Sequence, residues 1–273
     1  MESCALSGCS VIAVGGASVT IASNCDFGAA TRIAVFAHGV GTSVSIESSG
    51  LRGCRQAVCV AAGARVELMR CIVSGVTVIG CEVRGSGSTL ELRDCTVADA
   101  DWSSHSDWWI QGVWVHSGAR AIVTRCTLMR MVAGVLADGE GTELHLHEAS
   151  CVSNLACGAY VGCGATATFR ECDFFSVSDS PSQQLGLDVC NSGSSATMIH
   201  CRLRYMSFGA RVSDGATLKC VNCQTEQNGV AGWCAEQKGD ADLESCVSVG
   251  ERAYLLTSGA SCRTVLCRPD VMG

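Results

Sequence analysis

One phrase recurs along the chain and constrains its fold more than any other feature. The phrase is Gly-Ala-x-φ-x-φ-x-x-Cys-x-φ, in which φ is an apolar residue. Its clearest copy runs over residues 63–73, and further copies cover 88–97, 164–174 and 215–223. Apolar residues at every second position predict strands, and the Gly-rich breaks predict turns. Because a unit this short cannot bury its own apolar face, we expect the units to stack on one another.

The cysteine of each phrase marks the period of the repeat. Successive marker positions are 21 to 31 residues apart, with about 23 the typical spacing. We expect the markers to form one internal ladder, because a free thiol packs as a small hydrophobe; a disulfide or metal ladder is the alternative. The markers are Cys4, Cys25, Ser49, Cys71, Cys95, Cys126, Cys151, Cys172, Cys201, Cys223, Cys246 and Cys267.

A second phrase, Gly-φ-x-φ, falls between the markers and predicts another strand in each unit. It occurs at 112–115, 158–161, 186–189 and 209–212. Strands in stacked units pair with the unit above and the unit below. The left-handed form of such a solenoid is built on hexapeptides, and the sequence has no six-residue period. The prediction is therefore an all-β, right-handed parallel β-helix solenoid of about 11–12 coils, forming a single domain over 1–273.

These repeats resemble the parallel β-helix repeats of the pectin-lyase-like superfamily. They are similar in particular to the Gly- and Val-rich helices of non-catalytic eukaryotic proteins of the F-box β-helix type. The resemblance covers essentially the whole chain and implies the fold, but the superfamily mixes lyases, hydrolases, epimerases and binding modules. The Gly-His-Gly and Arg-x-Lys motifs of polygalacturonase-like enzymes are absent, as is the Asp-Pro-His-Glu run of alginate-epimerase-like enzymes. These absences favour a protein that is not an enzyme.

The amino-acid composition limits the classes of binding partner and the cellular compartment that we expect for this protein. The net charge of −7 argues against nucleic acid, which needs basic patches to neutralise phosphate. The sequence has no apolar run of 18 residues and no visible signal peptide, so we expect no membrane span. An odd number of cysteines, 21, in a long chain favours reduced thiols in an intracellular, reducing compartment. No cofactor is predicted.

Two coils are longer than the rest, and we expect both to bulge from the same corner of the rod. They span 31 residues after Cys95 and 29 residues after Cys172. Four of the five tryptophans lie in the first of these coils. They can fold the loop 99–109 back onto the rod, form a sugar-binding or protein-binding surface, or flank catalytic carboxylates. The candidate binding residues are Trp102, His105, Trp108, Trp109 and Trp114, and the candidate acids are Asp99, Asp101 and Asp107.

Glu143, His145 and His147 alternate with leucines, so all three should point outward from one strand. A His-x-His pair can bind zinc. Because the sequence suggests no fourth ligand, we interpret this strand as a solvated face and predict no metal site. Arg70, Asp94 and Arg125 precede markers on successive coils, which should place Asp94 between two cations.

The ends of the repeat bear on function. Met1 lies inside a coil with no cap ahead of it, and exposed strand edges invite pairing. We expect a protein partner or a second copy at one end, and therefore a rigid protein-interaction module or a structural subunit of a larger assembly. The alternative is a carbohydrate-binding or carbohydrate-active β-helix, with lyase, hydrolase or epimerase chemistry, that uses the Trp- and Asp-rich loop 99–109.

Overall fold

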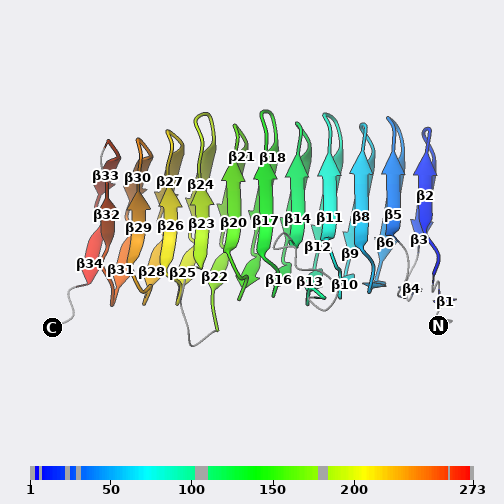
Figure 1. Cartoon of the computed structure of the whole chain (residues 1–273), viewed down its shortest axis with the longest axis horizontal. Helices are drawn as coiled ribbons and strands as arrows, with labels where there is room; N and C mark the ends of the chain where they lie inside the picture. The colour runs from blue at the N-terminus through cyan, green and yellow to red at the C-terminus, as the bar shows by residue number, and fades with distance from the viewer. Residues whose placement is uncertain are drawn as a thin grey trace.

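The chain folds as a rod of stacked coils, with β1 and β34 at its opposite ends (Figure 1). The computed structural model describes residues 4–5, 8–21, 25–28, 32–101, 110–177, 184–257 and 259–270. Within those ranges all regular secondary structure is β-strand, and no helix could span a membrane. The predicted all-β parallel solenoid is confirmed, because every paired strand runs parallel to the strand one coil away.

Three sheets run the length of the rod, and each coil gives one strand to each sheet. We name them sheet A, sheet B and sheet C. Sheet A contains β1 (Cys4–Ala5), β4 (Cys25–Phe27), β7 (Gly50–Arg52), β10 (Ile72–Ser74), β13 (Thr96–Ala98), β16 (Thr127–Met129), β19 (Ser150–Val152), β22 (Asp173–Phe175), β25 (Arg202–Arg204), β28 (Gln224–Glu226), β31 (Val247–Val249) and β34 (Arg268–Asp270).

Sheets B and C hold the longer strands. Sheet B contains β2 (Val11–Val14), β5 (Ile33–His38), β8 (Gln56–Ala61), β11 (Ile79–Arg84), β14 (Gln111–His116), β17 (Ala133–Asp138), β20 (Cys157–Gly162), β23 (Leu185–Val189), β26 (Phe208–Val212), β29 (Ala231–Ala235) and β32 (Tyr254–Leu256). Sheet C contains β3 (Ser18–Ile21), β6 (Ser43–Glu47), β9 (Arg65–Met69), β12 (Thr89–Arg93), β15 (Arg120–Thr124), β18 (Glu143–His147), β21 (Thr166–Arg170), β24 (Ser195–Ile199), β27 (Thr217–Val221), β30 (Asp240–Glu244) and β33 (Ser261–Val265).

Side chains of each strand alternate between the core and the outside, as period-two patterning requires. In β9, Val66 and Leu68 are fully buried, whereas the residues on either side of them are exposed or half-buried. Leu90 lies opposite Val66 on one neighbouring coil and opposite Ala121 on the other. Apolar side chains therefore stack on apolar side chains along most of the interior, and this burial stabilises coils that could not fold alone.

The corner between sheets C and A is built the same way in coil after coil. The residue before each ladder position adopts a left-handed backbone, with φ between 48° and 56° from Ser48 to Leu266. The next residue is usually a buried cysteine. Its thiol lies close to the peptide groups of the turn: Cys95 Sγ accepts from the backbone N–H of Cys71 at 3.4 Å and lies 3.4 Å from the carbonyl oxygen of Leu68. A small side chain that can also hydrogen-bond suits this position.

The strand register gives one correction to the predicted ladder. Ser150 pairs with Thr127 and with Asp173, so the ladder position next to Cys126 is held by Ala149. Cys151 lies two residues further on, opposite Leu128 and Phe174, in an inward row of sheet A. Both positions face the core, so a cysteine in either one fits the period-two pattern. The register gives the ladder as Cys25, Ser49, Cys71, Cys95, Cys126, Ala149, Cys172, Cys201, Cys223, Cys246 and Cys267.

Cys4 lies opposite Cys25 in the backbone pairing of β1 with β4. All cysteines for which the structure describes the side chain are free thiols. Burial raises the pKa of Cys151 and of Cys81, two inward-facing cysteines outside the ladder, well above the usual range, which favours neutral thiols there. The buried cysteines of the interior serve as packing groups.

A row of glycines lets the coils approach closely at the start of sheet B. From Gly80 to Gly209, a Cβ atom built on each glycine of the row would lie 2.4–2.7 Å from the carbonyl oxygen of the next glycine. No side chain fits at that distance. The Gly-φ-x-φ phrase of the sequence is therefore a packing requirement of this corner.

We predict that Gly158→Ala destabilises the rod. The new Cβ would meet Phe174 Cδ1 at 2.6 Å and Gly186 O at 2.7 Å. Overpacking of this kind costs about 1–3 kcal/mol, which should lower the midpoint of guanidinium denaturation. Gly50→Ala is the control, since its Cβ would meet only the ends of two charged side chains. Equal midpoints for the two variants would contradict the close-packing role of this row.

Candidate functional site

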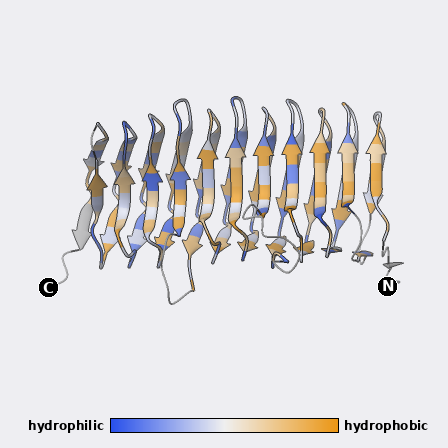
Figure 2. Cartoon of the chain, viewed as in Figure 1, coloured by the Kyte–Doolittle hydropathy of each residue, from blue (hydrophilic) through white to orange (hydrophobic). Residues whose placement is uncertain are grey.

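The outer face of sheet B carries a row of side chains from the centre of each strand. This is the x position of Gly-φ-x-φ, one residue from each coil, and it changes character along the rod. Figure 2 shows hydrophilic bands crossing β11, β23 and β26, whereas β17 between them is largely hydrophobic. The row reads Phe36, Cys59, Glu82, Trp114, Leu136, Tyr160, Asp188, Arg211 and Cys234.

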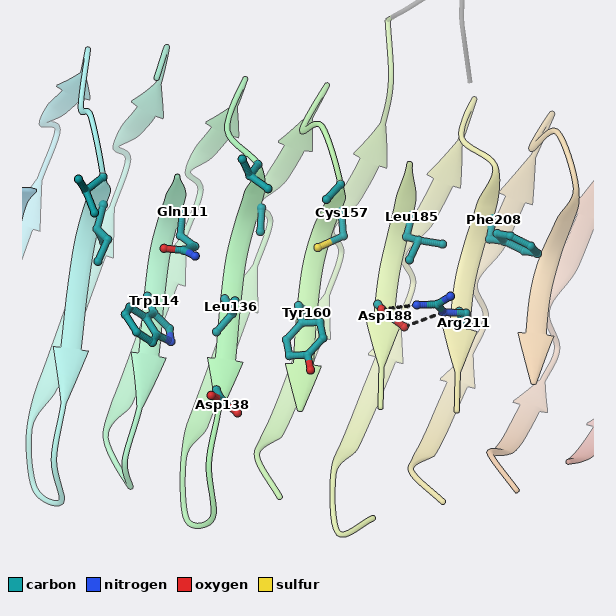
Figure 3. Close-up of a pocket in the computed structure, with 15 residues that line it drawn as sticks. Gln111, Trp114, Leu136, Asp138, Cys157, Tyr160, Leu185, Asp188, Phe208 and Arg211 are labelled. Carbon is teal, nitrogen blue, oxygen red and sulfur yellow. Dashed lines mark hydrogen bonds and ion pairs between the residues drawn. The ribbon is translucent and has the colours of Figure 1, made fainter. Parts of the chain in front are cut away.

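A groove of about 840 Å³ lies over the middle of this row. Its floor is mostly apolar, and its polar groups sit at defined points along it (Figure 3). It crosses the outer face of the strands from β11 to β26 and therefore follows the long axis of the rod. The lining residues are Val78, Ile79, Gln111, Trp114, Val132, Ala133, Leu136, Asp138, Ala156, Cys157, Tyr160, Leu185, Asp188, Phe208 and Arg211.

Two aromatic rings form the centre of the groove floor. Trp114 and Tyr160 lie two coils apart, about 10 Å at the usual spacing of paired strands, with Leu136 between them. Gly162 makes room for the phenol, because a Cβ there would lie 2.6 Å from the Tyr160 ring. Burial raises the pKa of Tyr160 well above its usual range, and so does the hydrogen bond with Cys190, so its hydroxyl stays neutral.

A buried ion pair closes the C-terminal side of the groove. Arg211 donates from Nε to Asp188 Oδ1 at 3.0 Å and from Nη2 to Asp188 Oδ2 at 2.7 Å (Figure 3). Asp188 is 6% exposed, and its hydrogen bonds raise the pKa of Arg211. The nearby thiol of Cys157 is also neutral, because burial raises its pKa to about 12. The guanidinium is thus held in one orientation by a two-point hydrogen bond.

A second polar group lies on the N-terminal side of Trp114. Glu82 Oε1 is 3.0 Å from His116 Nε2, and Glu82 Oε2 accepts from Gln56 Nε2 at 2.6 Å. Burial by itself raises the pKa of Glu82, but the hydrogen bonds from His116 and Gln56 and the charge of Arg84 lower it on balance. The His116 ring stacks on Trp114 at a centroid distance of 4.2 Å. This network fixes the Trp114 ring from one side.

Two arginines extend the site further toward the N-terminal end. A hollow of about 380 Å³ is lined by Arg32, Arg55, Gln56 and neighbouring apolar residues, and Val78 lines both this hollow and the groove. Arg32 and Arg55 hold equivalent positions on adjacent coils, because Ile33 pairs with Gln56. Among the described residues, neither guanidinium has a carboxylate oxygen within 4.0 Å. Two exposed arginine side chains on adjacent coils therefore line this hollow.

Elsewhere on the rod, arginines on one coil meet carboxylates on the next. Arg125 binds Asp94 through two hydrogen bonds of 2.7 and 2.9 Å. The hydrogen bond from Arg125 lowers the pKa of Asp94, and the charges of Arg125 and Arg70 lower it further, so Asp94 lies between two cations as predicted. Arg70 also hydrogen-bonds to Glu47. These surface pairs contribute little stability each. They match the stacking of the coils.

The predicted Trp loop falls largely outside the described residues. Trp102, His105, Asp107, Trp108 and Trp109 lie in that part of the chain. Trp114 lies on the groove floor.

The two candidate acids that the structure describes lie where the loop leaves sheet A. Asp99 forms an ion pair with Arg130, and the hydrogen bond from Arg130 lowers the pKa of Asp99. Asp101 donates its backbone N–H to Val76 O. Neither lines the groove. Both long connections re-enter the rod at groove residues, the first at Gln111 and the second at Leu185.

Sequence reasoning missed Tyr160, Asp188 and Arg211 as site residues. Each is the x residue of a Gly-φ-x-φ phrase, so the signal was present in the sequence. The phrase indicated a strand, and its x position was not compared between coils. With the register known, these residues and Trp114 fall into a single row.

The strand with alternating histidines points outward as predicted, and its three polar side chains are exposed or half-buried. His145 Nε2 is 3.7 Å from Glu143 Oε2. His147 lies instead with Glu148 and Glu171, and the three ligand atoms fall within 4.8 Å of one another. Zinc sites in proteins usually have four ligands, and this group offers three.

Comparison with known proteins supports the fold. Residues 2–151 match a family model described as a right-handed β-helix region, and the chain belongs to this family. No curated protein matches the chain. The resemblance to the F-box type remains a prediction from the sequence.

Three solved structures share the architecture at low sequence identity. The periplasmic alginate epimerase AlgG is 11% identical, with a TM-score of 0.50 over 88% of this chain and 78% of that one. An alginate lyase from Paenibacillus sp. str. FPU-7 is 8% identical, with a TM-score of 0.51 over 97% and 99%. The catalytic unit of a thermostable α-1,3-glucanase from Streptomyces thermodiastaticus strain HF3-3 is 10% identical, with a TM-score of 0.53 over 93% and 61%. At these identities the likeness concerns the fold.

We predict that Glu82→Gln lowers stability in a pH-dependent way. The folded-state pKa of Glu82 lies below the unfolded value of about 4.3. The carboxylate therefore stabilises the fold above that pH, and this contribution is lost as the pH falls through the folded pKa. The urea midpoint of the variant should be lower than that of the wild type at pH 7, and the gap should close below about pH 4. Glu140→Gln, at an exposed turn, is the control. A gap that stays constant to pH 3 would show that the carboxylate charge is not what holds His116.

Proposed function

We propose that the sheet B groove binds a polysaccharide chain lying along the rod. The observation that carries the proposal is the floor of Trp114, Leu136 and Tyr160, with fixed polar groups on both sides. Sugar rings have an apolar C–H face and a polar hydroxyl edge. Aromatic rings can stack on the C–H face, and oriented charged groups can hydrogen-bond to the hydroxyl edge.

The shape of the site suits a linear ligand. Its floor is built from strands that pair on both sides, so its side chains are held on rigid elements. A volume of about 840 Å³ falls within the range of 300–1,000 Å³ that is usual for ligand sites. The groove also continues past Val78 to the arginine hollow. A polymer can occupy both parts, whereas a single sugar can occupy only one.

The arginine hollow favours an acidic sugar. Arg32 and Arg55 are exposed at equivalent positions on adjacent coils, so an anion that lies between them can interact with both. Guanidinium groups bind carboxylates through two parallel hydrogen bonds. Arg211 has its own carboxylate in Asp188 and so serves as a fixed hydrogen-bonding edge. We therefore infer that uronic acid residues bind at the N-terminal end of the groove.

The named activities of the structural neighbours suggest which polysaccharides to try. Two act on alginate and one on an α-1,3-glucan. Because shared fold does not carry function, they support the proposal only by showing that this architecture accommodates such chains. The protein-interaction module predicted from the sequence is a separate hypothesis with a different ligand.

We predict that Trp114→Ala and Tyr160→Ala each weaken binding of the preferred polysaccharide about tenfold, or roughly 1.4 kcal/mol. Each removes one stacking ring from the groove floor. Affinity would be measured by calorimetry on a panel that includes alginate and α-1,3-glucan, with product analysis to detect cleavage. Phe175→Ala, on the outer face of sheet A, is the control and should bind normally. A wild-type protein that binds nothing in the panel, or ring variants that bind as it does, would overturn the proposal.

We predict that Arg32→Gln and Arg55→Gln weaken binding of acidic oligosaccharides severalfold and leave neutral ones unaffected. The wild-type affinity for the acidic ligands should fall with added salt, and the double variant should lose most of that dependence. Arg202→Gln is the matched control, since Arg202 is an exposed arginine on sheet A. Equal losses for acidic and neutral ligands would exclude carboxylate recognition by this pair.

A further inference from the structure

Two cysteines flank the groove in the turns that follow β20 and β23. Cys163 comes directly after Gly162, and Cys190 directly after Val189. Because Val161 pairs with Val189, the two cysteines lie on adjacent coils and differ by one residue in register. One strand spacing and one residue rise place their Cα atoms about 5.8 Å apart. Disulfides usually join Cα atoms 4.4–6.8 Å apart.

Both sulfurs lie on the same side of the turns. The side-chain amide of Asn191 donates to Cys163 Sγ at 3.6 Å and to Cys190 Sγ at 3.5 Å. Cys163 is exposed and Cys190 half-buried, whereas Cys172 and Cys201 of the ladder are buried. A small oxidant can therefore reach Cys163 first, with Cys190 beside it.

This pair is connected to the groove through one hydrogen bond. The Cys190 thiol donates to Tyr160 Oη at 3.0 Å, and Tyr160 belongs to the aromatic floor. Asp138, which also lines the groove, raises the pKa of Cys163. The resting state is thus a protonated dithiol whose hydrogen bonds hold a groove residue in place.

We propose that Cys163 and Cys190 form a reversible disulfide by exchange with a small disulfide such as oxidised glutathione. The Cys163 thiolate attacks one glutathione sulfur, the glutathione S–S bond breaks, and one glutathione thiolate leaves. The Cys190 thiolate then displaces the second glutathione and closes the protein disulfide. The two protein protons pass to the two released thiolates. Two protein thiols are oxidised and one glutathione disulfide is reduced to two glutathione molecules.

Disulfide formation removes the proton that Cys190 donates to Tyr160. The phenol then loses its partner at the edge of the groove, and the ring is no longer held from that side. This consequence rests on the proposed function: we expect the oxidised form to bind polysaccharide more weakly than the reduced form. Reduction restores the thiol and with it the hydrogen bond.

Peptide mapping after equilibration in glutathione buffers tests the disulfide. The full chain is alkylated under native conditions and digested, and we expect one cross-linked pair of peptides that contains Cys163 and Cys190. Cys163→Ser and Cys190→Ser should each abolish it, and the buried Cys172 should stay reduced in all samples. If the pair stays reduced in oxidised glutathione alone while the exposed Cys9 becomes glutathionylated, the proposal fails.

Calorimetry on the same samples tests the link to the groove. We expect oxidation to weaken polysaccharide binding at least threefold, dithiothreitol to restore it, and both serine variants to be insensitive. A disulfide that leaves affinity unchanged overturns the link to Tyr160. If the reduced protein binds no polysaccharide, the proposed function fails, and mapping still decides whether the disulfide forms.

Discussion

The parallel register between successive coils is the constraint on which the rest of the structure depends. Each strand pairs with the strand one coil away, so a residue has a fixed neighbour above and a fixed neighbour below. Rows of equivalent residues, at one strand spacing, therefore become the units of packing. Leu90 rests on Val66 because their strands pair, and Arg125 reaches Asp94 for the same reason. A change in register would disrupt all of these pairs at the same time.

The inner rows show how tightly that constraint acts. At the corner between sheets C and A, a left-handed residue turns the chain, and the next position accepts only a small side chain. At the start of sheet B, the coils approach so closely that only glycine fits from Gly80 onward. Both rows keep neighbouring coils at a constant spacing. The groove on the outer face of sheet B is built on these evenly spaced strands, so its side chains are positioned before any ligand binds.

The sequence predicted the inner rows better than the outer ones. Period-two patterning and the cysteine spacing were enough for the parallel solenoid, because burial imposes the same residue types on every coil. The wrong assignment of Cys151 to the ladder shows the limit of that reasoning. Ala149 and Cys151 both face the core, and only the strand pairing shows which of them holds the ladder position. The outer row has no repeated residue type. Trp114, Tyr160 and Arg211 could be grouped only once the exact length of each intervening coil was known.

The charged residues on the outside of the rod also depend on the register between coils. Stacking places like charges one strand spacing apart unless the sequence alternates their sign. Asp94 with Arg125 and Asp188 with Arg211 follow that alternation, and each pair is satisfied within the protein. Arg32 and Arg55 carry like charges at equivalent positions on adjacent coils, beside a groove whose floor is aromatic. An anionic chain that lies across both guanidinium groups would interact with two positive charges at once, and this is the electrostatic reason for proposing an acidic ligand.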